Sequence, residues 1–370
     1  MGKKIILAVA GSGKTYHICH NLNPNKKNLI LAYTHSNIKN IKKELIEAWG
    51  NIPELTTILT FDSFVNRYML SPYEPTILDF FKKDNFKSNG ITLKSPPPQS
   101  IIRGKKRFKN PHYYRKEYFE HYNTNGFYYC KTMSELIMYV KEGKNKLIKR
   151  IAGNINMFFD HVLIDEYQDF REHDYDLIME LAKNLINITM VGDYFQHSVS
   201  AINNSGKPFA TTKGEVNYEN YIENLKKAKF IIDNTSLSKS RRCSSDICEF
   251  VFEKIGIEIY STGDQSGNVY FIEKDIDKIL EDDSIVKLVY NNANKFNFNA
   301  LNWSYSKGDT LNNICVILTE DFDEIQSSEF KYNGSPSTRN KIYVALTRTK
   351  GDLYIIRNQD FKKIKAKYMK

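Results

Sequence analysis

Residues 5–15 read IILAVAGSGKT, and this stretch decides the fold. The apolar start, residues 5–7, has the composition of a buried parallel strand. The small residues that follow let backbone N–H groups converge on phosphate oxygens, and a helix beginning there adds a partial positive charge. The lysine would bridge terminal phosphates and the threonine hydroxyl would bind Mg²⁺. The pattern therefore predicts a phosphate-binding loop formed by Ala10, Gly11, Ser12, Gly13, Lys14 and Thr15.

A second apolar run, residues 161–164, ends in a pair of carboxylates, Asp165 and Glu166. An acid at the end of a strand beside a phosphate loop can complete a Mg²⁺ site, which would then be held by Thr15 and Asp165. The adjacent acid, Glu166, would orient or deprotonate an attacking water. The alternative is an ordinary acidic loop after a strand, and the phosphate loop upstream argues against it.

Composition sets the broad class. The chain has 370 residues, of which 41% are hydrophobic and 26% charged, as expected for a globular protein of two or three domains. No apolar run approaches the ~20 residues that span a bilayer, so we expect a cytoplasmic protein without membrane contact. The five cysteines are scattered and form no Cys-x-x-Cys pair, which predicts reduced packing residues rather than a disulfide framework.

The net charge of +10 is concentrated in one segment. Residues 71–150 contain 17 Lys and Arg against seven Asp and Glu, so this segment carries the whole excess. A basic, aromatic-rich block predicts a polyanion partner, although a solvated basic face remains the alternative.

Seven further short segments follow the phosphate loop in a fixed order: residues 29–45, 60–64, 165–169, 191–196, 240–244, 306–310 and 343–349. With these segments the chain resembles a superfamily 1 helicase of the UvrD/Rep/PcrA type, in which they correspond to motifs Ia to VI. The resemblance covers nearly the whole chain. It implies a DNA helicase that hydrolyses ATP with Mg²⁺ and translocates on single-stranded DNA, 3′ to 5′.

The resemblance also implies an α/β fold with two RecA-like P-loop NTPase domains, each built on a parallel sheet. The first would comprise residues 1–70 and 151–227, interrupted by the basic insertion at 71–150. The second would comprise residues 228–370. Its strands are expected at the apolar runs 230–232, 286–290, 314–318 and 353–356.

Four polar residues carry family roles in nucleotide hydrolysis. Gln168 and Gln196 would report whether the γ-phosphate is present. Arg242 and Arg348 would reach the phosphates from the second domain and stabilise charge that develops during transfer. Hydrolysis would then be coupled to closure of the cleft between the domains.

The chain departs from the family at several positions. No glutamine precedes the phosphate loop, which leaves the preference for adenine open. Residues 197–201 offer no base-stacking platform beyond His197, and Asp62 and Thr310 replace the usual His and Glu. Only about sixty residues separate Arg242 from residue 306, so the family's 2B subdomain is expected to be absent.

The predicted DNA-binding residues fall into two groups. By resemblance, Thr34, Asn37, Thr60 and Phe64 would contact a single strand, with Phe64 stacking on a base. The basic run adds Lys105, Lys106, Arg107 and Lys109, because unpaired lysines are rarely buried. The nearby aromatics would either stack on bases or form the insertion's own core: Tyr113, Tyr114, Tyr118, Phe119, Tyr122, Phe127, Tyr128 and Tyr129.

Three functions remain open at this point. The first is a DNA-dependent translocase or helicase, with DNA repair as a plausible setting. The second is a DNA-sensing regulatory ATPase that unwinds little and licenses a partner such as a nuclease, for example in antiviral defence. The third is a small-molecule kinase, which the ordered motifs with Gln168, Gln196, Arg242 and Arg348 argue against.

Overall fold

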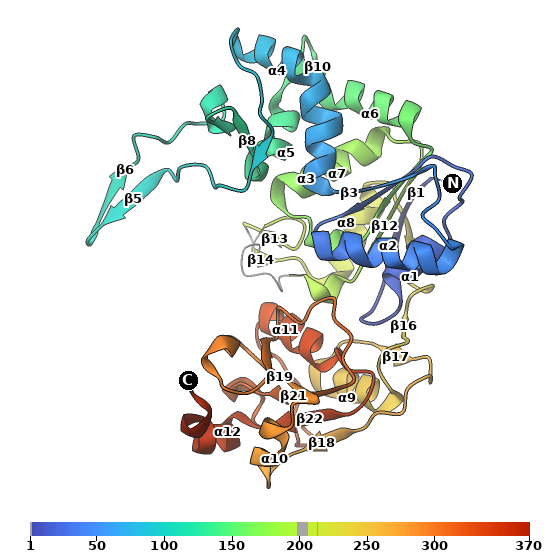
Figure 1. The fold of residues 1–370 in the computed structure, drawn as a ribbon, viewed down its shortest axis with the longest axis vertical. Helices are drawn as coiled ribbons and strands as arrows, with labels where there is room; N and C mark the ends of the chain where they lie inside the picture. The colour runs from blue at the N-terminus through green and yellow to red at the C-terminus, as the bar shows by residue number, and fades with distance from the viewer. Residues whose placement is uncertain (1, 198–205, 213) are drawn as a thin grey trace.

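The computed structural model describes residues 2–197, 206–212 and 214–370 and contains two α/β units, one above the other in Figure 1. The first unit is built on a parallel six-stranded sheet of order β15-β1-β12-β11-β2-β3. Its strands are β1 (Lys3–Leu7), β2 (Asn28–Ala32), β3 (Thr56–Thr60), β11 (His161–Ile164), β12 (Ile188–Gly192) and β15 (Ile231–Asp233).

Helices cover both faces of this sheet, and apolar side chains in the middle of its strands point to both sides. Residues alternate between faces: Ile5 and Leu7 pack into one core cluster, whereas Ile6 packs into another. The second cluster lies under α1 (Lys14–His20) and α2 (His35–Trp49). The first lies under α3 (Phe61–Phe64), α5 (Cys130–Tyr139), α6 (Leu147–Phe158), α7 (Glu172–Asn184) and α8 (Tyr218–Lys227).

The second unit has a parallel five-stranded sheet of order β18-β22-β21-β19-β20. Its strands are β18 (Val269–Phe271), β19 (Ile285–Val289), β20 (Ala300–Asn302), β21 (Asn313–Ile317) and β22 (Leu353–Ile356). Its helices are α9 (Ser245–Ile255), α10 (Ile276–Glu281), α11 (Pro336–Leu346) and α12 (Asn358–Ile364), and a short parallel pair, β16 (Lys239–Ser240) and β17 (Tyr260–Ser261), lies at its edge. Two parallel sheets flanked by helices confirm the predicted fold class.

One strand prediction is wrong. Residues 230–232 were expected in the second sheet, but β15 pairs in parallel with β1 in the first sheet. The chain therefore passes from one unit to the other after Asp233 rather than near residue 228. An apolar run of this kind predicts a strand but not the sheet in which it pairs.

Every element between Arg242 and Ser306 belongs to the second unit: α9, α10 and the strands β17 to β20. This part of the chain is fully described and holds no inserted subdomain, as expected.

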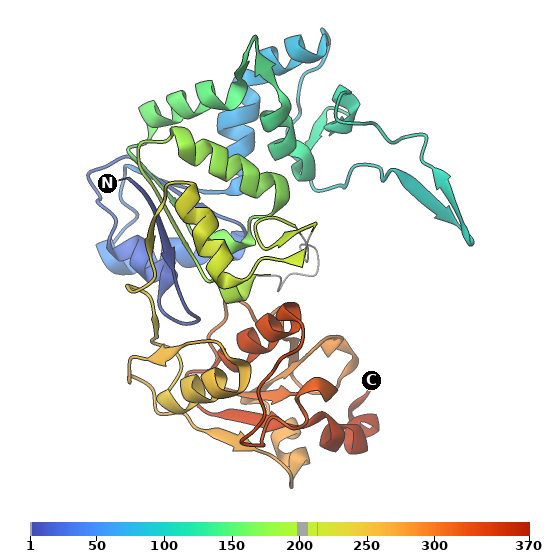
Figure 2. The same cartoon turned by 180° about the vertical axis from the view of Figure 1, so that it is seen from behind.

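The basic segment is a set of small elements on the first unit. They are α4 (Glu74–Phe81), β4 (Ile91–Thr92), β5 (Ser100–Arg103), β6 (Lys106–Lys109), β7 (Asn123–Thr124), β8 (Phe127–Tyr129), β9 (Lys141–Glu142) and β10 (Asn145–Lys146), in addition to α5. The hairpin of β5 and β6 projects away from the body of the molecule in both views (Figures 1 and 2). A further small hairpin, β13 (Ala210–Thr211) and β14 (Gly214–Glu215), precedes α8.

Candidate functional site: a cavity between the two units

The phosphate loop joins β1 to α1 and contacts the second unit directly. Gly13 caps α1 in the left-handed region (φ 84°, ψ 42°), and Gly11 has φ 70°. A Cβ on Gly11 would lie 2.5 Å from the Cβ of Arg242 and 2.7 Å from Ser240 Oγ, so only glycine permits this approach. The N–H of Arg241 also donates to the Gly11 carbonyl at 2.9 Å. The loop is therefore built to meet the segment that carries Arg242.

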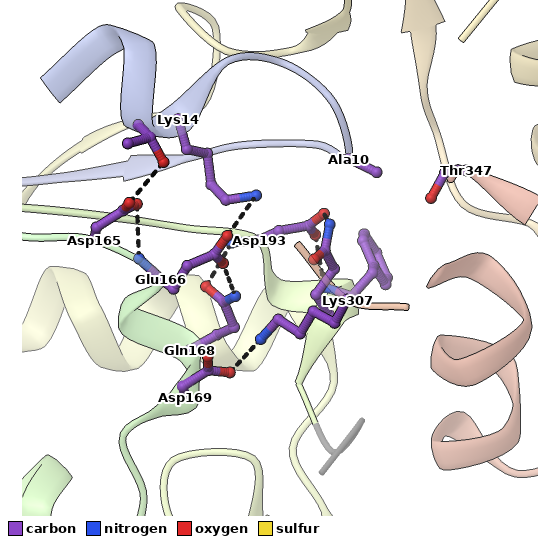
Figure 3. Close-up of polar contacts among 12 residues, drawn as sticks. Ala10, Lys14, Asp165, Glu166, Gln168, Asp169, Asp193, Lys307 and Thr347 are labelled. Carbon is purple, nitrogen blue, oxygen red and sulfur yellow. Dashed lines mark hydrogen bonds and ion pairs between the residues drawn. The ribbon is translucent and has the colours of Figure 1, made fainter. Parts of the chain in front are cut away.

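The predicted metal ligands lie side by side. Thr15 Oγ1 donates to Asp165 Oδ2 at 2.7 Å, and Asp165 Oδ1 accepts from the Glu166 N–H at 2.9 Å. Hard cations such as Mg²⁺ prefer hydroxyl and carboxylate oxygens, so this pair fits the ion that the fold implies. Lys14 Nζ lies 3.5 Å from Glu166 Oε1, between the loop and the carboxylates (Figure 3).

The two carboxylates titrate in opposite directions. Burial, followed by the neighbouring Glu166, raises the pKa of Asp165 to about 7. Burial would also raise the pKa of Glu166, but the ammonium groups of Lys14 and Lys307 outweigh it and hold that pKa below its usual range. Glu166 is thus ionised at neutral pH, as a group that is to take a proton from water must be. A cation bound at Asp165 would likewise favour its carboxylate form.

A hydrogen-bonded chain connects the carboxylates to the second unit. Gln168 Nε2 donates to Glu166, and Gln168 Oε1 accepts from the Asp193 N–H at 2.9 Å. The carboxylate of Asp193 accepts from Gln196 Nε2 at 2.9 Å and from the Tyr343 hydroxyl at 3.1 Å. That hydroxyl in turn accepts from the N–H of Ala10 in the phosphate loop at 2.8 Å. The two predicted sensors, Gln168 and Gln196, therefore share one partner, Asp193.

Two guanidinium groups face the loop from the second unit. Arg348 is 1% exposed, and its Nε donates to the Val344 carbonyl at 2.9 Å. Arg242 donates from Nε to Thr310 Oγ1 at 3.0 Å and from Nη1 to the Thr347 carbonyl at 3.1 Å. Burial and the adjacent Arg242 lower the pKa of Arg348 to about 9. Within the described chain neither arginine forms an ion pair with a carboxylate.

A cavity of about 400 Å³ lies between these groups. Gly11, Gly13, Lys14, Thr15, Glu166 and Gln196 line it from the first unit, and Arg241, Arg242, Thr310, Arg348 and Lys350 from the second. Two carboxylates, Glu44 and Glu166, face it together with six cationic side chains: Lys14, Lys43, Arg241, Arg242, Arg348 and Lys350. Its volume suits a small ligand, and the excess of positive charge suits a polyphosphate.

An aromatic ring marks the outer part of the cavity. Tyr16 is 41% exposed and stacks on His20 with ring centroids 3.7 Å apart. The Arg241 guanidinium lies 5.0 Å from the centroid of the Tyr16 ring, and both residues line the cavity. A flat ring and a flat cation that face one another in this way can stack on a heterocycle.

Sequence reasoning missed several residues of this site. Asp193 and Tyr343 join the sensors to the loop, and Lys307 forms an ion pair with Asp169 across the two units (Figure 3). Each of these three residues lies within one of the short segments on which the helicase resemblance rests, and that position could have pointed to it. Arg241 also lies within such a segment, at residues 240–244, whereas Tyr16 lies outside all of them. The contact between these two side chains depends on how the units meet.

The predicted single-strand contacts mostly have other roles. Phe64 is 0% exposed and packs near Phe61 and Tyr68, so its ring has no free face for the predicted base stacking in this structure. Thr60 is buried and caps α3 by accepting from the Ser63 N–H at 3.3 Å. The short apolar helix that follows β3 needs both residues for packing and capping.

The other pair of predicted contacts divides between two places. Thr34 is exposed and caps α2 by accepting from the Asn37 N–H at 3.1 Å. Asn37 lines the cavity described above, so the structure places it with the phosphate loop instead of on a DNA path. Helix α2 starts next to α1, which brings its first turn to the cavity.

His197 is also unavailable as a platform for bases. It is 4% exposed and its ring stacks on Phe209 with centroids 4.0 Å apart. Burial lowers its pKa to about 3, so it is neutral. Residues 198–201, the rest of the stretch considered for stacking, lie outside the described residues.

The insertion divides its aromatic residues between core and surface. Phe119, Tyr122, Tyr128 and Tyr129 are at most 5% exposed and form a small core, whereas Tyr114, Tyr118 and Phe127 are exposed and Tyr113 is partly exposed. Lys105, Lys106, Arg107 and Lys109 are all exposed on the projecting hairpin, as expected for a surface that binds a polyanion.

Comparisons with known proteins bear on this geometry. Residues 77–198 match the model of the UvrD/REP helicase N-terminal domain. Two ATP-dependent DNA helicases PcrA, from two strains of Staphylococcus epidermidis, are 24% identical over 238 residues, which cover 52% of this chain and 31% of theirs. Residues 77–198 are therefore similar to the N-terminal domain of UvrD/REP helicases. The chain spans about a third of the length of these curated relatives.

Two solved viral helicase structures also align with the chain. The complex of Arterivirus nonstructural protein 10 (helicase) with DNA aligns with a TM-score of 0.45 and 12% identity, covering 95% of this chain and 60% of that chain. The PRRSV helicase aligns with a TM-score of 0.44 and 13% identity, covering 99% of this chain and 54% of that chain.

In the described part of the chain no helix is long and apolar enough to cross a membrane.

Proposed function

We propose that this chain hydrolyses ATP in the cavity between its two units and couples hydrolysis to movement along single-stranded DNA. The observation that carries the proposal is the pair Arg242 and Arg348, which face the phosphate loop without a carboxylate partner in the described chain. Two neighbouring cations repel each other, and a bound polyphosphate would remove that repulsion.

The residues divide the reaction between them. Lys14 and the loop amides would bind the β- and γ-phosphates, and Thr15 and Asp165 would hold Mg²⁺, which neutralises phosphate charge when bound. Glu166 would orient the attacking water and accept its proton. Arg242 and Arg348 would stabilise the charge that builds up on the transferred phosphoryl group.

Nucleotide state would reach the second unit through two sets of contacts. Gln196 lines the cavity and shares Asp193 with Tyr343, whose hydroxyl accepts from the loop. A γ-phosphate that binds the loop amides would compete for the Ala10 N–H. The contact between the units would then depend on whether triphosphate or diphosphate is bound, which is what a translocating motor requires.

The identity of the base is a separate question. Tyr16 and Arg241 would lie against the base, and the amide side chains of Asn37, Asn40 and Gln265 also line the cavity, where they would be available to hydrogen-bond to it. Translocation from 3′ to 5′ is proposed from the family resemblance alone.

A second candidate function has its own observation. Phe64 and His197, two positions where bases would be stacked, are both buried. A chain with few base-stacking residues would bind single-stranded DNA weakly and translocate along it inefficiently. It could instead act as a DNA-sensing ATPase that licenses a partner such as a nuclease.

Two assays separate these candidates. ATP turnover measured with and without single-stranded DNA should rise with DNA, and Lys14→Ala should abolish it because the terminal phosphates lose their bridging charge. Displacement of a labelled strand from a tailed duplex should accompany turnover in a helicase. DNA-stimulated turnover without displacement would favour the sensing ATPase, and turnover that survives in Lys14→Ala would reject both.

A further inference from the structure

The hairpin of β5 and β6 is a separate arm of the molecule. Its strands pair antiparallel from Ser100↔Lys109 to Arg103↔Lys106, and Gly104 (φ 60°) opens the two-residue turn between them. Both views show it projecting away from the two units (Figures 1 and 2). The arm is therefore placed to contact a ligand outside the cavity between the two units.

The base of the arm is fixed. Asn110 is 6% exposed, its N–H donates to the Gln99 carbonyl at 3.1 Å, and its Nδ2 donates to the Pro98 carbonyl at 2.8 Å. The neighbouring run of prolines, residues 96–98, restricts the backbone on the other side. A stem that is cross-linked by hydrogen bonds and stiffened by proline holds the arm in one direction.

Both faces of this ribbon are accessible and basic. Cross-strand partners share a face, so Arg107 lies with Ile102 and with Lys109, whereas Lys106 lies with Arg103 and with Phe108. All six side chains are exposed, with Ile102 at 72% and Phe108 at 47%. A two-stranded ribbon that packs on its own protein has one buried apolar face, and this ribbon has none.

The charge of the arm is uncompensated. Residues 85–116 contain nine Lys and Arg and no Asp or Glu. Among the described residues, no ion pair involves Arg103, Lys106, Arg107 or Lys109. The partner must therefore supply the negative charge, and it must do so on both sides of the ribbon.

We propose that this arm inserts into the major groove of B-form duplex DNA, next to the single strand held by the two units. The major groove is about 12 Å wide, admits a two-stranded β-ribbon and has phosphates along both walls. A single strand or a flat anionic surface would meet only one face. The major groove of an RNA duplex is too narrow and deep for side chains to enter.

The exposed apolar side chains fit the same site. Ile102 and Phe108 point from opposite faces of the ribbon, where they would meet base edges and thymine methyl groups without hydrogen-bonding requirements. Binding would then depend on duplex geometry more than on sequence. The inference rests on the proposed function only in taking DNA as the substrate.

The test compares the two faces of the ribbon on a blunt DNA duplex. Arg107→Gln with Lys109→Gln removes the charge of one face, and Arg103→Gln with Lys106→Gln removes the charge of the other. Each pair should flatten the slope of log affinity against log salt by up to about 1.8, since each phosphate contact contributes about 0.9. Combining all four should flatten it by up to about 3.6.

Matched controls keep the result specific. Lys226→Gln with Lys227→Gln removes two exposed charges from α8 and should leave the slope unchanged. An RNA duplex of the same sequence should bind more weakly than DNA to the unmodified protein, and the face variants should change its slope little.

Three results would overturn the inference. A slope that changes with only one face would mean that the ribbon lies flat on its ligand. Equal binding to RNA and DNA duplexes would exclude the groove, and unchanged slopes in all face variants would exclude the arm altogether. ATP turnover at saturating single-stranded DNA is a separate readout. Turnover that persists in the four-fold variant supports the proposed function even if the arm does not bind duplex DNA. Turnover that is absent in the unmodified protein rejects the proposed function alone.

Discussion

The first sheet brings carboxylates and a phosphate loop to the cavity, whereas the second sheet brings cations. Asp165 and Glu166 follow β11, and the guanidinium groups of Arg242 and Arg348 come from the opposite side. Neither half contains both the groups that bind phosphate and the groups that stabilise transferred charge. The difference teaches that the complete cavity exists only while the two units are in contact, so the proposed nucleotide hydrolysis would depend on that contact.

Removing the acid of the first sheet should have the largest effect. Glu166→Gln keeps the size of the side chain but cannot accept a proton, so turnover should fall by about 10²–10⁴-fold. Nucleotide affinity should stay within a few-fold, because Lys14 and the loop are intact. Steady-state ATPase kinetics together with equilibrium binding of a fluorescent nucleotide measure both quantities. Turnover near that of the unmodified protein would contradict the assigned role of Glu166.

Removing a cation of the second sheet should slow the reaction in a different way. Arg348→Ala should lower kcat by about 10²–10³-fold, because its charge acts mainly on the transition state. KM should change little. Arg357→Ala is the control, since Arg357 also belongs to the second unit but pairs with Asp360 at 2.8 Å outside the cavity. If KM rose while kcat held, Arg348 would bind the ground state instead.

The smallest expected effect is on stability and comes from an ion pair in the insertion, far from the cavity. His121 Nε2 lies 3.0 Å from Glu135 Oε2, and this hydrogen bond raises the pKa of His121. The ion pair stabilises the fold fully below the unfolded pKa of His121, near 6.5, and this contribution is lost as pH rises through the folded pKa.

His121→Gln should therefore lose at most about 1 kcal/mol of unfolding free energy at pH 6 and less at pH 8. Urea unfolding at both pH values measures the difference. His112→Gln, at an exposed histidine of the same insertion, should show no such pH dependence. A loss that grows with pH would contradict the ion pair.

Much of the geometry of the candidate site could be predicted from sequence because it is local. The loop from Ala10 to Thr15 and the acids after β11 occupy contiguous segments whose spacing is fixed by a strand that ends and a helix that begins. The ordered motifs then placed Gln196, Arg242 and Arg348, and the structure brings all three to one cavity.

The predictions failed where the outcome depended on packing between distant segments. Phe64 and His197 are in the expected segments, but neighbouring aromatic rings bury both. The strand at residues 231–233 pairs with β1, more than 220 residues away, and no local pattern encodes that partner. The two-sided ribbon was likewise hidden, because a run of basic residues does not tell which faces it exposes.

The path of the chain between the units has a kinetic consequence. In the described part of the chain, residues 234–238 form the one covalent crossing, between β15 in the first unit and β16 at the edge of the second. Both walls of the cavity belong to one polypeptide, so its closure is intramolecular. A tether this short sets an effective concentration in the range of millimolar. The arginines therefore meet the phosphate loop equally often in dilute and in concentrated solution, and no second copy of the chain is required to complete the site.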